Sequence, residues 1–245
     1  MGYIEDRRYL KFGARCLFFN RLGGVSKPPY DSLNVSFNVG DNENSVNANI
    51  GILKEISDAK EVCLINQVHS NKIVFCDDTS KVTNADGIYA DKANIFYGIK
   101  FADCMPIVLF DTKNRIGLCL HAGWRGSKLK IAKKAVKFLK EKGSEPKNVI
   151  ATFGPHICNG CYEIQDDVAS QFESEFIRID NGKIYLDLSL INKTQLIEEG
   201  VFDNSVVDMN ICTYESNEFF SYRRDKICGR NIGGLIFKDG ASDRS

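Results

Sequence analysis

The chain lacks several features that would place it in a broad class of protein. No apolar run reaches the roughly 18 to 20 residues that are needed to cross a bilayer. The opening stretch MGYIEDRRYLKFG has no long apolar region of the kind found in a secretory signal. Neither GxGxxG nor the GxxxxGK phosphate loop is present. We therefore expect a cytoplasmic protein with no membrane partner and no standard nucleotide-phosphate loop.

The chain also lacks an excess of charge of either sign. Its 32 basic residues balance 32 acidic ones, so the formal net charge is zero. A neutral balance gives no overall field that would attract nucleic acid or anionic lipid. We therefore expect a small-molecule partner, and any recognition of phosphate must come from local arginines. The sequence does not indicate an oligomeric state.

Cysteines are too sparse for a dense disulfide framework. Nine are present, and the odd number leaves at least one unpaired. A reducing compartment with mostly buried thiols is the simpler interpretation. One CxxC pair, Cys158 and Cys161, follows Gly-Pro rather than opening a helix. Without a second such pair it is weak evidence for a zinc ribbon or a redox site.

Hydrophobic periodicity predicts strands mixed with helices in irregular order. Helices are predicted over residues 47–60, 126–142, 165–176 and 188–199. Strands are predicted over residues 12–19, on both sides of His69, in the apolar runs between Gly87 and His121, in NVIATFGP, and in the late segments VVDMNICTY and FFSYRRD. No repeat, low-complexity segment or linker divides the chain. The pattern favours an α+β fold with mixed sheets and a single domain over residues 1–245.

Three side chains suit one open metal site. Cys104 closes the string FADC, and His121, 17 residues later, opens HAGWRG on a neighbouring predicted strand. His69, in NQVHS, lies on the connection between two earlier strands. A thiolate and two imidazoles suit Zn²⁺, and three protein ligands leave a fourth position for water or substrate. The spacing therefore predicts a catalytic metal centre rather than a structural one.

Eight strings together resemble one family in their order along the chain. They are NRLGGVS, SLN, NQVHS, ADGIYA, FADCMPI, HAGWRG, GPHICNGCYEI and SYRRDKICGRN. They resemble the YfiH-like family, also called the laccase-domain or polyphenol-oxidase family, which includes purine nucleoside phosphorylases. The resemblance runs from about Phe12 to Asn231. It implies a layered sandwich of mixed sheets flanked by helices, and a zinc site at the family's His, Cys and His positions, which match His69, Cys104 and His121.

The same resemblance implies the activity. Family members look like enzymes that use phosphate to split adenosine, inosine and methylthioadenosine, and that also deaminate adenosine. A water acidified by zinc can attack purine C6, whereas phosphorolysis needs phosphate held against the ribose. Arginine forks match phosphate oxygens, so Arg21, Arg125 and Arg223 are candidates for that task, with Arg125 next to the metal ligands also a catalytic candidate.

Other residues near the predicted ligands have two interpretations each. Asp103 precedes Cys104 and is either an acid/base or ligand-orienting residue or a strand-end cap. Gln67 either binds substrate or satisfies its amide on the backbone. His156 and Cys228 depart from the family's usual small residues, which puts the shape of nearby loops in doubt.

Three alternatives remain open. Three histidines are too few for a full multicopper centre, but one copper could occupy the same ligands and support phenol oxidation. Cys104 and His121 could instead form the nucleophile and base of a hydrolase that edits peptidoglycan precursors. A non-enzymatic zinc-stabilised binding module is the third alternative.

Overall fold

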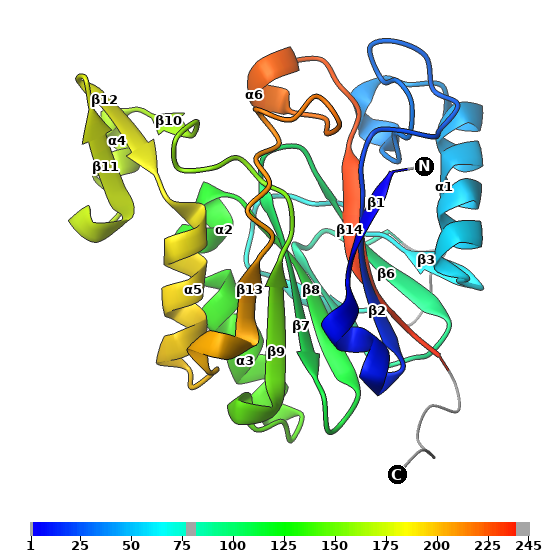
Figure 1. Cartoon of the computed structure of the whole chain (residues 1–245), viewed down its shortest axis with the longest axis horizontal. Coiled ribbons are helices and arrows are strands. Elements are labelled where there is room, and N and C mark those ends of the chain that lie inside the picture. The colour runs from blue at the N-terminus through cyan, green and yellow to red at the C-terminus, as the bar shows by residue number, and fades with distance from the viewer. Residues whose placement is uncertain (1, 77–81, 239–245) are drawn as a thin grey trace.

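Two large mixed sheets form the centre of the computed structural model, which describes residues 2–76 and 82–238 (Figure 1). The first sheet has five strands in the order β1-β2-β14-β6-β3. These are β1 (Tyr3–Asp6), β2 (Ala14–Phe19), β14 (Asn231–Phe237), β6 (Ile95–Phe101) and β3 (Glu61–Cys63). Its neighbours are antiparallel except for the parallel pair β3 and β6.

The second sheet has six strands in the order β13-β9-β7-β8-β5-β4. These are β13 (Val206–Asp208), β9 (Val149–Phe153), β7 (Met105–Asp111), β8 (Ile116–Ala122), β5 (Gly87–Ala90) and β4 (Ile73–Phe75). The edge pairs β13 with β9 and β4 with β5 are parallel, and the inner pairs are antiparallel. Both sheets are therefore mixed, as the fold-class prediction requires.

Helices cover the outer faces of the two sheets. Helix α1 (Glu43–Ser57) packs on the five-stranded sheet, while α3 (Ile131–Glu141) and α5 (Leu188–Glu198) pack on the six-stranded one (Figure 1). Three shorter helices are α2 (Trp124–Lys128), α4 (Asp166–Ala169) and α6 (Tyr222–Asp225). A small sheet of β10 (Glu163–Ile164), β12 (Lys183–Leu186) and β11 (Ile177–Asp180) projects at one side (Figure 1). The prediction of an α+β sandwich is confirmed.

The apolar runs in the central strands arise because both faces of each strand are buried. In β7, Ile107 and Leu109 face the helices, whereas Val108 and Phe110 face the other sheet. Such strands are continuous rather than alternating in hydrophobicity, since alternate side chains enter two different apolar layers. The layer between the sheets fixes the two sheets against each other.

Three of the four helix predictions are wrong in part. The predicted helix over 126–142 is two helices, because Lys130 has a left-handed backbone with φ of 58° between α2 and α3. The predicted helix over 165–176 is reduced to α4 and one 3-10 turn at Ser174–Phe176. Helix α1 begins at Glu43, where Asn42 caps the amides of the first turn, and not at residue 47.

Two late strand predictions are also corrected. FFSYRRD contains helix α6, whose first turn is capped by the Ser221 side chain accepting from the Arg224 backbone amide. VVDMNICTY contributes only the short edge strand β13. The strand that lies in the middle of the five-stranded sheet is β14, which no sequence pattern predicted.

Disulfide bonding differs from the prediction at one pair. Cys63 and Cys76 are bonded to each other, while seven cysteines are free. Most cysteines are therefore thiols, as predicted. Within residues 2–76 and 82–238, no helix has both the length and the apolar character needed to span a membrane.

Two glycines explain why the sequence pattern did not predict β14 and why this strand fits between β2 and β6. Gly233 and Gly234 weaken the strand pattern, since glycine is depleted in strands. A Cβ at Gly234 would lie 1.9 Å from the Tyr97 carbonyl oxygen. We expect Gly234→Ala to destabilise the fold by about 3 kcal/mol or more, because a backbone contact cannot relax as a side chain can.

Gly51→Ala is the matched control for this substitution. Gly51 lies in α1, and nothing lies within 4 Å of an added Cβ. We expect it to stabilise the fold by about 0.5 to 1 kcal/mol, because alanine favours a helix more than glycine does. Urea denaturation of both variants measures the difference. Equal midpoints for Gly234→Ala and the unmodified chain would contradict the proposed contact.

Candidate active site

The three predicted metal ligands lie together. His69 is on the connection from β3 to β4, Cys104 is on the connection from β6 to β7, and His121 is in β8. Their possible ligand atoms all lie within 4.8 Å of one another. The His69 and His121 rings meet edge to face, with centroids 5.0 Å apart. These residues could therefore hold one metal ion.

A buried carboxylate, Asp86, holds two of the three residues in place. Its Oδ1 accepts from Nδ1 of His121 at 2.9 Å and from the His69 backbone amide at 3.0 Å. Its Oδ2 accepts from the Ser70 amide at 2.6 Å and the Ser70 hydroxyl at 2.8 Å. A carboxylate on Nδ1 leaves Nε2 of His121 as the metal-binding nitrogen. Asp86 was not predicted from the sequence, although it lies in the ADGIYA string.

The backbone at the site is held in uncommon conformations. His69 has φ of 61° and Asp103 has φ of 90°, both in the region that favours glycine. Such conformations persist only where surrounding contacts enforce them. At His69 the enforcing contacts are the bonds from the 68–70 amides to Asp86. The Asp86 carboxylate therefore fixes the conformation of the loop at residues 68–70 without the help of a ligand.

Cys104 and His121 change each other's protonation. Burial alone would raise the pKa of Cys104, but His121 and His69 outweigh it and lower the pKa to about 6. Burial alone would lower the pKa of His121, but Cys104 and Asp86 raise it to about 9. Near neutral pH and without metal, the pair is thus a thiolate beside an imidazolium. Thiolate is the form of cysteine that binds metal or attacks an electrophile.

The three residues open into one cavity of about 440 Å³. The other lining residues are Ser36, Asn38, Val39, Asn66, Gln67, Lys100, Phe101, Ala102, Tyr222 and Arg230. They come from loops around both sheets, from the end of β6 and from α6. A pocket of this size, with a few convergent polar groups, is typical of a small-molecule site.

Asp103 and Arg223 act on each other rather than on the cavity. Asp103 is buried, and its two oxygens accept from the Thr213 hydroxyl at 2.8 Å and the Arg223 amide at 2.6 Å. The Arg223 guanidinium donates to the Glu163 carbonyl and lies 5.5 Å from the Tyr162 ring centroid. Asp103 therefore connects the start of α6 to the segment that carries Cys104. Tyr162, whose pKa is raised by burial and by the nearby Cys104, was not predicted.

The other site residues predicted from the sequence contact the backbone or other side chains. They are Arg21, Arg125 and Gln67. Arg21 donates to the Asp31 carbonyl and pairs with its carboxylate at 3.1 Å. Arg125 is exposed, with its guanidinium 4.3 Å from the Trp124 ring centroid. Gln67 lines the cavity, but its amide exchanges two hydrogen bonds with the Lys100 backbone. None of the three predicted arginines is among the described residues that line the cavity.

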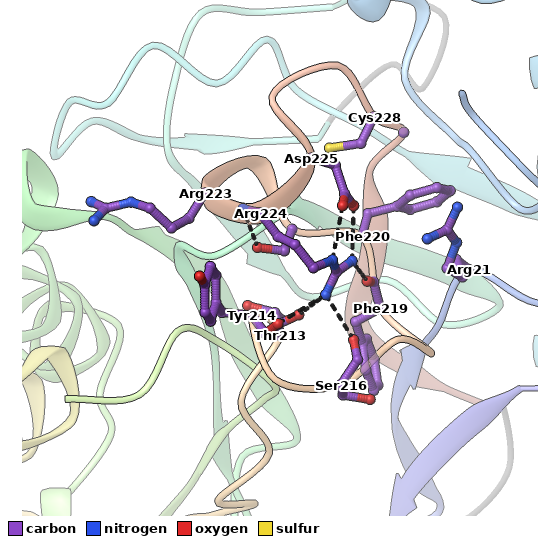
Figure 2. Close-up of polar contacts among 12 residues, drawn as sticks. Arg21, Thr213, Tyr214, Ser216, Phe219, Phe220, Arg223, Arg224, Asp225 and Cys228 are labelled. Atoms are coloured by element: carbon purple, nitrogen blue, oxygen red, sulfur yellow. Dashed lines mark hydrogen bonds and ion pairs between the residues drawn. The ribbon is translucent and has the colours of Figure 1, made fainter. Parts of the chain in front are cut away.

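Arg224, the neighbour of Arg223, organises the loop before α6. Figure 2 shows its guanidinium at the centre of a ring of acceptors, while Arg223 points away from it. The acceptors are the carbonyls of Thr213, Tyr214, Ser216 and Phe219 and the carboxylate of Asp225. Arg224 thus donates hydrogen bonds to loop carbonyls that are not paired in a strand. It stands in SYRRDK, but sequence alone did not separate its role from that of Arg223.

The cations of the cavity are Lys100 and Arg230. Lys100 lies in β6 and donates from Nζ to the Ile65 carbonyl at 2.7 Å. Burial, with a smaller effect of the Arg230 charge, lowers the pKa of Lys100 to about 8. The Arg230 guanidinium lies 5.8 Å from the Tyr222 ring centroid. Two cations that repel each other in a partly buried cavity favour an anionic ligand between them.

The chain matches a known family over most of its length. The family model described as "Multi-copper polyphenol oxidoreductase laccase" covers residues 15–238. The chain belongs to this family. The resemblance to YfiH-like proteins is thereby confirmed.

Relatives in this family bear a different name from that of the family model. A purine nucleoside phosphorylase of Streptomyces coelicolor is 32% identical over 93% of this chain and 96% of its own length. One from Clostridium acetobutylicum is 34% identical over 83% of this chain and 88% of its own length.

Solved structures of the family share the fold. YlmD of Geobacillus stearothermophilus has a TM-score of 0.86 at 30% identity, with 94% of each chain covered. The hypothetical protein YfiH of Bacillus licheniformis has a TM-score of 0.90 at 27% identity, with 96% of each chain covered. The layered α+β architecture is thus that of the family.

Asp86→Asn tests the role of the buried carboxylate. The amide keeps the shape but faces several donors with an NH₂ group, so we expect a loss of about 3 kcal/mol in stability. We also expect loss of bound metal, since His121 and the 68–70 loop lose their common acceptor. Denaturation and elemental analysis measure the two effects.

Asp111→Asn is the matched control. Asp111 is equally buried and accepts from the amides of Lys113 and Asn114, but it lies at the other end of β7 from Cys104. We expect a comparable loss of stability with metal content unchanged. Full metal content in Asp86→Asn would contradict the role assigned to Asp86.

Proposed function

We propose that the protein is a metal-dependent purine nucleoside phosphorylase that acts in the cytoplasm on adenosine, inosine and methylthioadenosine. The observation that carries the proposal is one cavity that combines an open three-ligand group with two cations. The ligand group is His69, Cys104 and His121, and the cations are Lys100 and Arg230. The names of the family's relatives support the same activity.

The donor set fits zinc best. One thiolate and two imidazoles are borderline-soft ligands, and three of them leave one position open to the cavity. Copper is an alternative ion for the same donors. When bound, zinc would supply Lewis acidity to a substrate oxygen or to water, the second being the basis of the proposed adenosine deaminase side activity.

The protein's own residues would bind and orient the substrates. Lys100 and Arg230 would hold phosphate, in place of the three arginines suggested by the sequence, because they line the cavity. Asn38 and Ser36 offer polar groups for ribose hydroxyls, and the Tyr222 ring offers a face for the purine. Asp86 would keep His121 in one tautomer, and Asp103 would position α6. Arg21 and Arg223 would act through loop structure, whereas Arg125 lies in α2 against the Trp124 ring.

A cysteine hydrolase that edits peptidoglycan precursors is the second candidate. The observation that favours it is the thiolate beside an imidazolium, which is the ground state of many cysteine nucleophiles. Bound metal would occupy the thiolate, so the two candidates differ in metal content. A polyphenol oxidase with one copper is a weaker alternative. With three histidines in all, the chain does not supply the ligands for the several coppers named in the family description.

Phosphate-dependent release of free base from adenosine and inosine tests the proposal. We expect metal-loaded protein to release base only when phosphate is present, and Cys104→Ala to lose at least about 100-fold in kcat/KM because it loses the thiolate ligand. His69→Ala should lose turnover while its thermal unfolding stays cooperative. Formation of inosine from adenosine without phosphate reports the deaminase activity separately.

Three results would count against the phosphorylase. Equal release by the unmodified chain and Cys104→Ala would indicate a contaminating enzyme. No release by zinc-loaded protein would direct attention to amide-bearing substrates, and rapid alkylation of Cys104 in metal-free, active protein would favour the hydrolase.

The pH dependence tests Lys100 as a phosphate ligand. Only the charged amine attracts phosphate, and its pKa of about 8 lies well below the ordinary value. We therefore expect kcat/KM for phosphate to fall above about pH 8, approaching about tenfold per pH unit. Lys100→Arg keeps its charge at all these pH values, so that part of the fall should disappear.

Lys134→Arg is the matched control, because Lys134 is exposed on α3 away from the cavity. It should keep the profile of the unmodified chain. Comparing variants at each pH removes the titration of phosphate itself, which all of them share. An identical fall above pH 8 in Lys100→Arg would overturn the assignment of Lys100.

A further inference from the structure

A second group of metal-ligand side chains lies outside the cavity described above. Cys158 and Cys161 are on the connection from β9 to β10, and Cys212 and Glu215 are on the segment from β13 to α6. Their possible ligand atoms all lie within 4.8 Å of one another. Four side chains from two distant parts of the chain thus converge on one point.

Contacts within the group already join the two segments. The Cys158 amide donates to the Cys212 sulfur at 3.3 Å, and the Cys161 thiol donates to a Glu215 oxygen at 3.3 Å. A tight turn, in which the Cys161 amide donates to the Cys158 carbonyl at 3.0 Å, brings the two cysteines of the CxxC to the same side. Cys212 and Glu215 are thus partners of the CxxC that the sequence pattern did not predict.

We propose that Cys158, Cys161, Cys212 and Glu215 bind a structural zinc ion. Three thiolates and one carboxylate supply four protein ligands, which is the number that closes a tetrahedral site. Ligand atoms about 2.3 Å from a tetrahedral zinc lie roughly 3.8 Å apart. The group therefore needs to contract by only about 1 Å at its widest separation. Soft thiolate ligands select zinc over magnesium or calcium.

The ion would fasten two loops that support the first site. The first loop carries Ile157, whose amide donates to the Asp103 carbonyl at 2.9 Å. The second carries Thr213, whose hydroxyl donates to the Asp103 carboxylate. The Arg224 guanidinium already holds the carbonyls of this second loop (Figure 2). Zinc would therefore secure these two contacts of Asp103, the residue that precedes Cys104.

A closed site with four protein ligands contributes to folding rather than to chemistry. A structural ion stabilises the folded chain because the unfolded chain does not preform its ligands. Removing it should lower the unfolding midpoint and loosen the loops around Asp103. This distinguishes the second site from the first, where an open position is left to the cavity.

Metal content measures the proposal directly. The double variant His69→Ala and Cys104→Ala lacks two ligands of the first group, so zinc that remains belongs to the second. We expect it to retain one zinc per chain after dialysis. Retention of none, in folded protein purified with zinc, would overturn the proposal.

Glu215→Gln and Glu218→Gln in that background form a matched pair. Both change an acid to an amide in one exposed loop, but only Glu215 belongs to the group. We expect Glu215→Gln to weaken zinc binding by more than about tenfold, since losing even an outer partner of a ligand costs about that much. Equal zinc affinity in the two variants would exclude Glu215 as a ligand.

Alkylation of the unmodified chain avoids variants that fail to fold. We expect Cys158, Cys161 and Cys212 to resist a thiol reagent until a chelator is added, as read by peptide mass mapping. Buried Cys119, in the layer between the sheets, is the internal control and should be unaffected by chelator in folded protein. Unchanged labelling of all three with chelator, or a disulfide between any two in freshly purified reduced protein, would overturn the proposal.

Discussion

The arrangement of the candidate site depends on one buried carboxylate. Asp86 has no solvent exposure. The free-energy cost of removing its charge from water is offset by hydrogen-bond donors in the His69 loop and in His121. Burial would raise its pKa, but the bonds from His121 and Ser70 outweigh burial and lower it, so it stays ionised at neutral pH. An ionised Asp86 both shapes the loop and sets the imidazole tautomer. The protein itself therefore sets the positions of His69 and His121.

The sequence predicted residues whose chemistry is distinctive but not those whose role depends on pairing. The sequence predicted the ligand group because few residue types bind zinc and because each member stands in a short continuous motif. The group is His69, Cys104 and His121. Lys100 resembles any lysine in a strand until β14 pairs with β6 and brings Arg230 near it. The partners of a long side chain also depend on tertiary contacts, since the Arg223 guanidinium donates to the Glu163 carbonyl of a neighbouring loop.

Errors in the fold have equally specific causes. The helix predicted over 126–142 ignores Lys130, whose left-handed backbone starts a second helix without any glycine to signal it. Strand β14 was missed because its two glycines weaken the pattern, yet they are what allow the close approach to β6 and to Phe18. The α+β class survives these errors, because it depends on the long buried strands between Gly87 and His121. Local periodicity identifies such strands, but tertiary contacts decide the rest.

The chain passes from one sheet to the other at two of the three candidate metal-ligand positions. His69 follows β3 of the five-stranded sheet and precedes β4 of the six-stranded sheet, and Cys104 makes the same passage between β6 and β7. Lys100 belongs to the first sheet and His121 to the second. The thickness of the apolar layer between the sheets, set by side chains such as Phe18 and Phe110, therefore fixes the span between the cations and the ligand group. Because neither phenylalanine lines the cavity, repacking this layer would change the width of the cavity through residues that lie outside it.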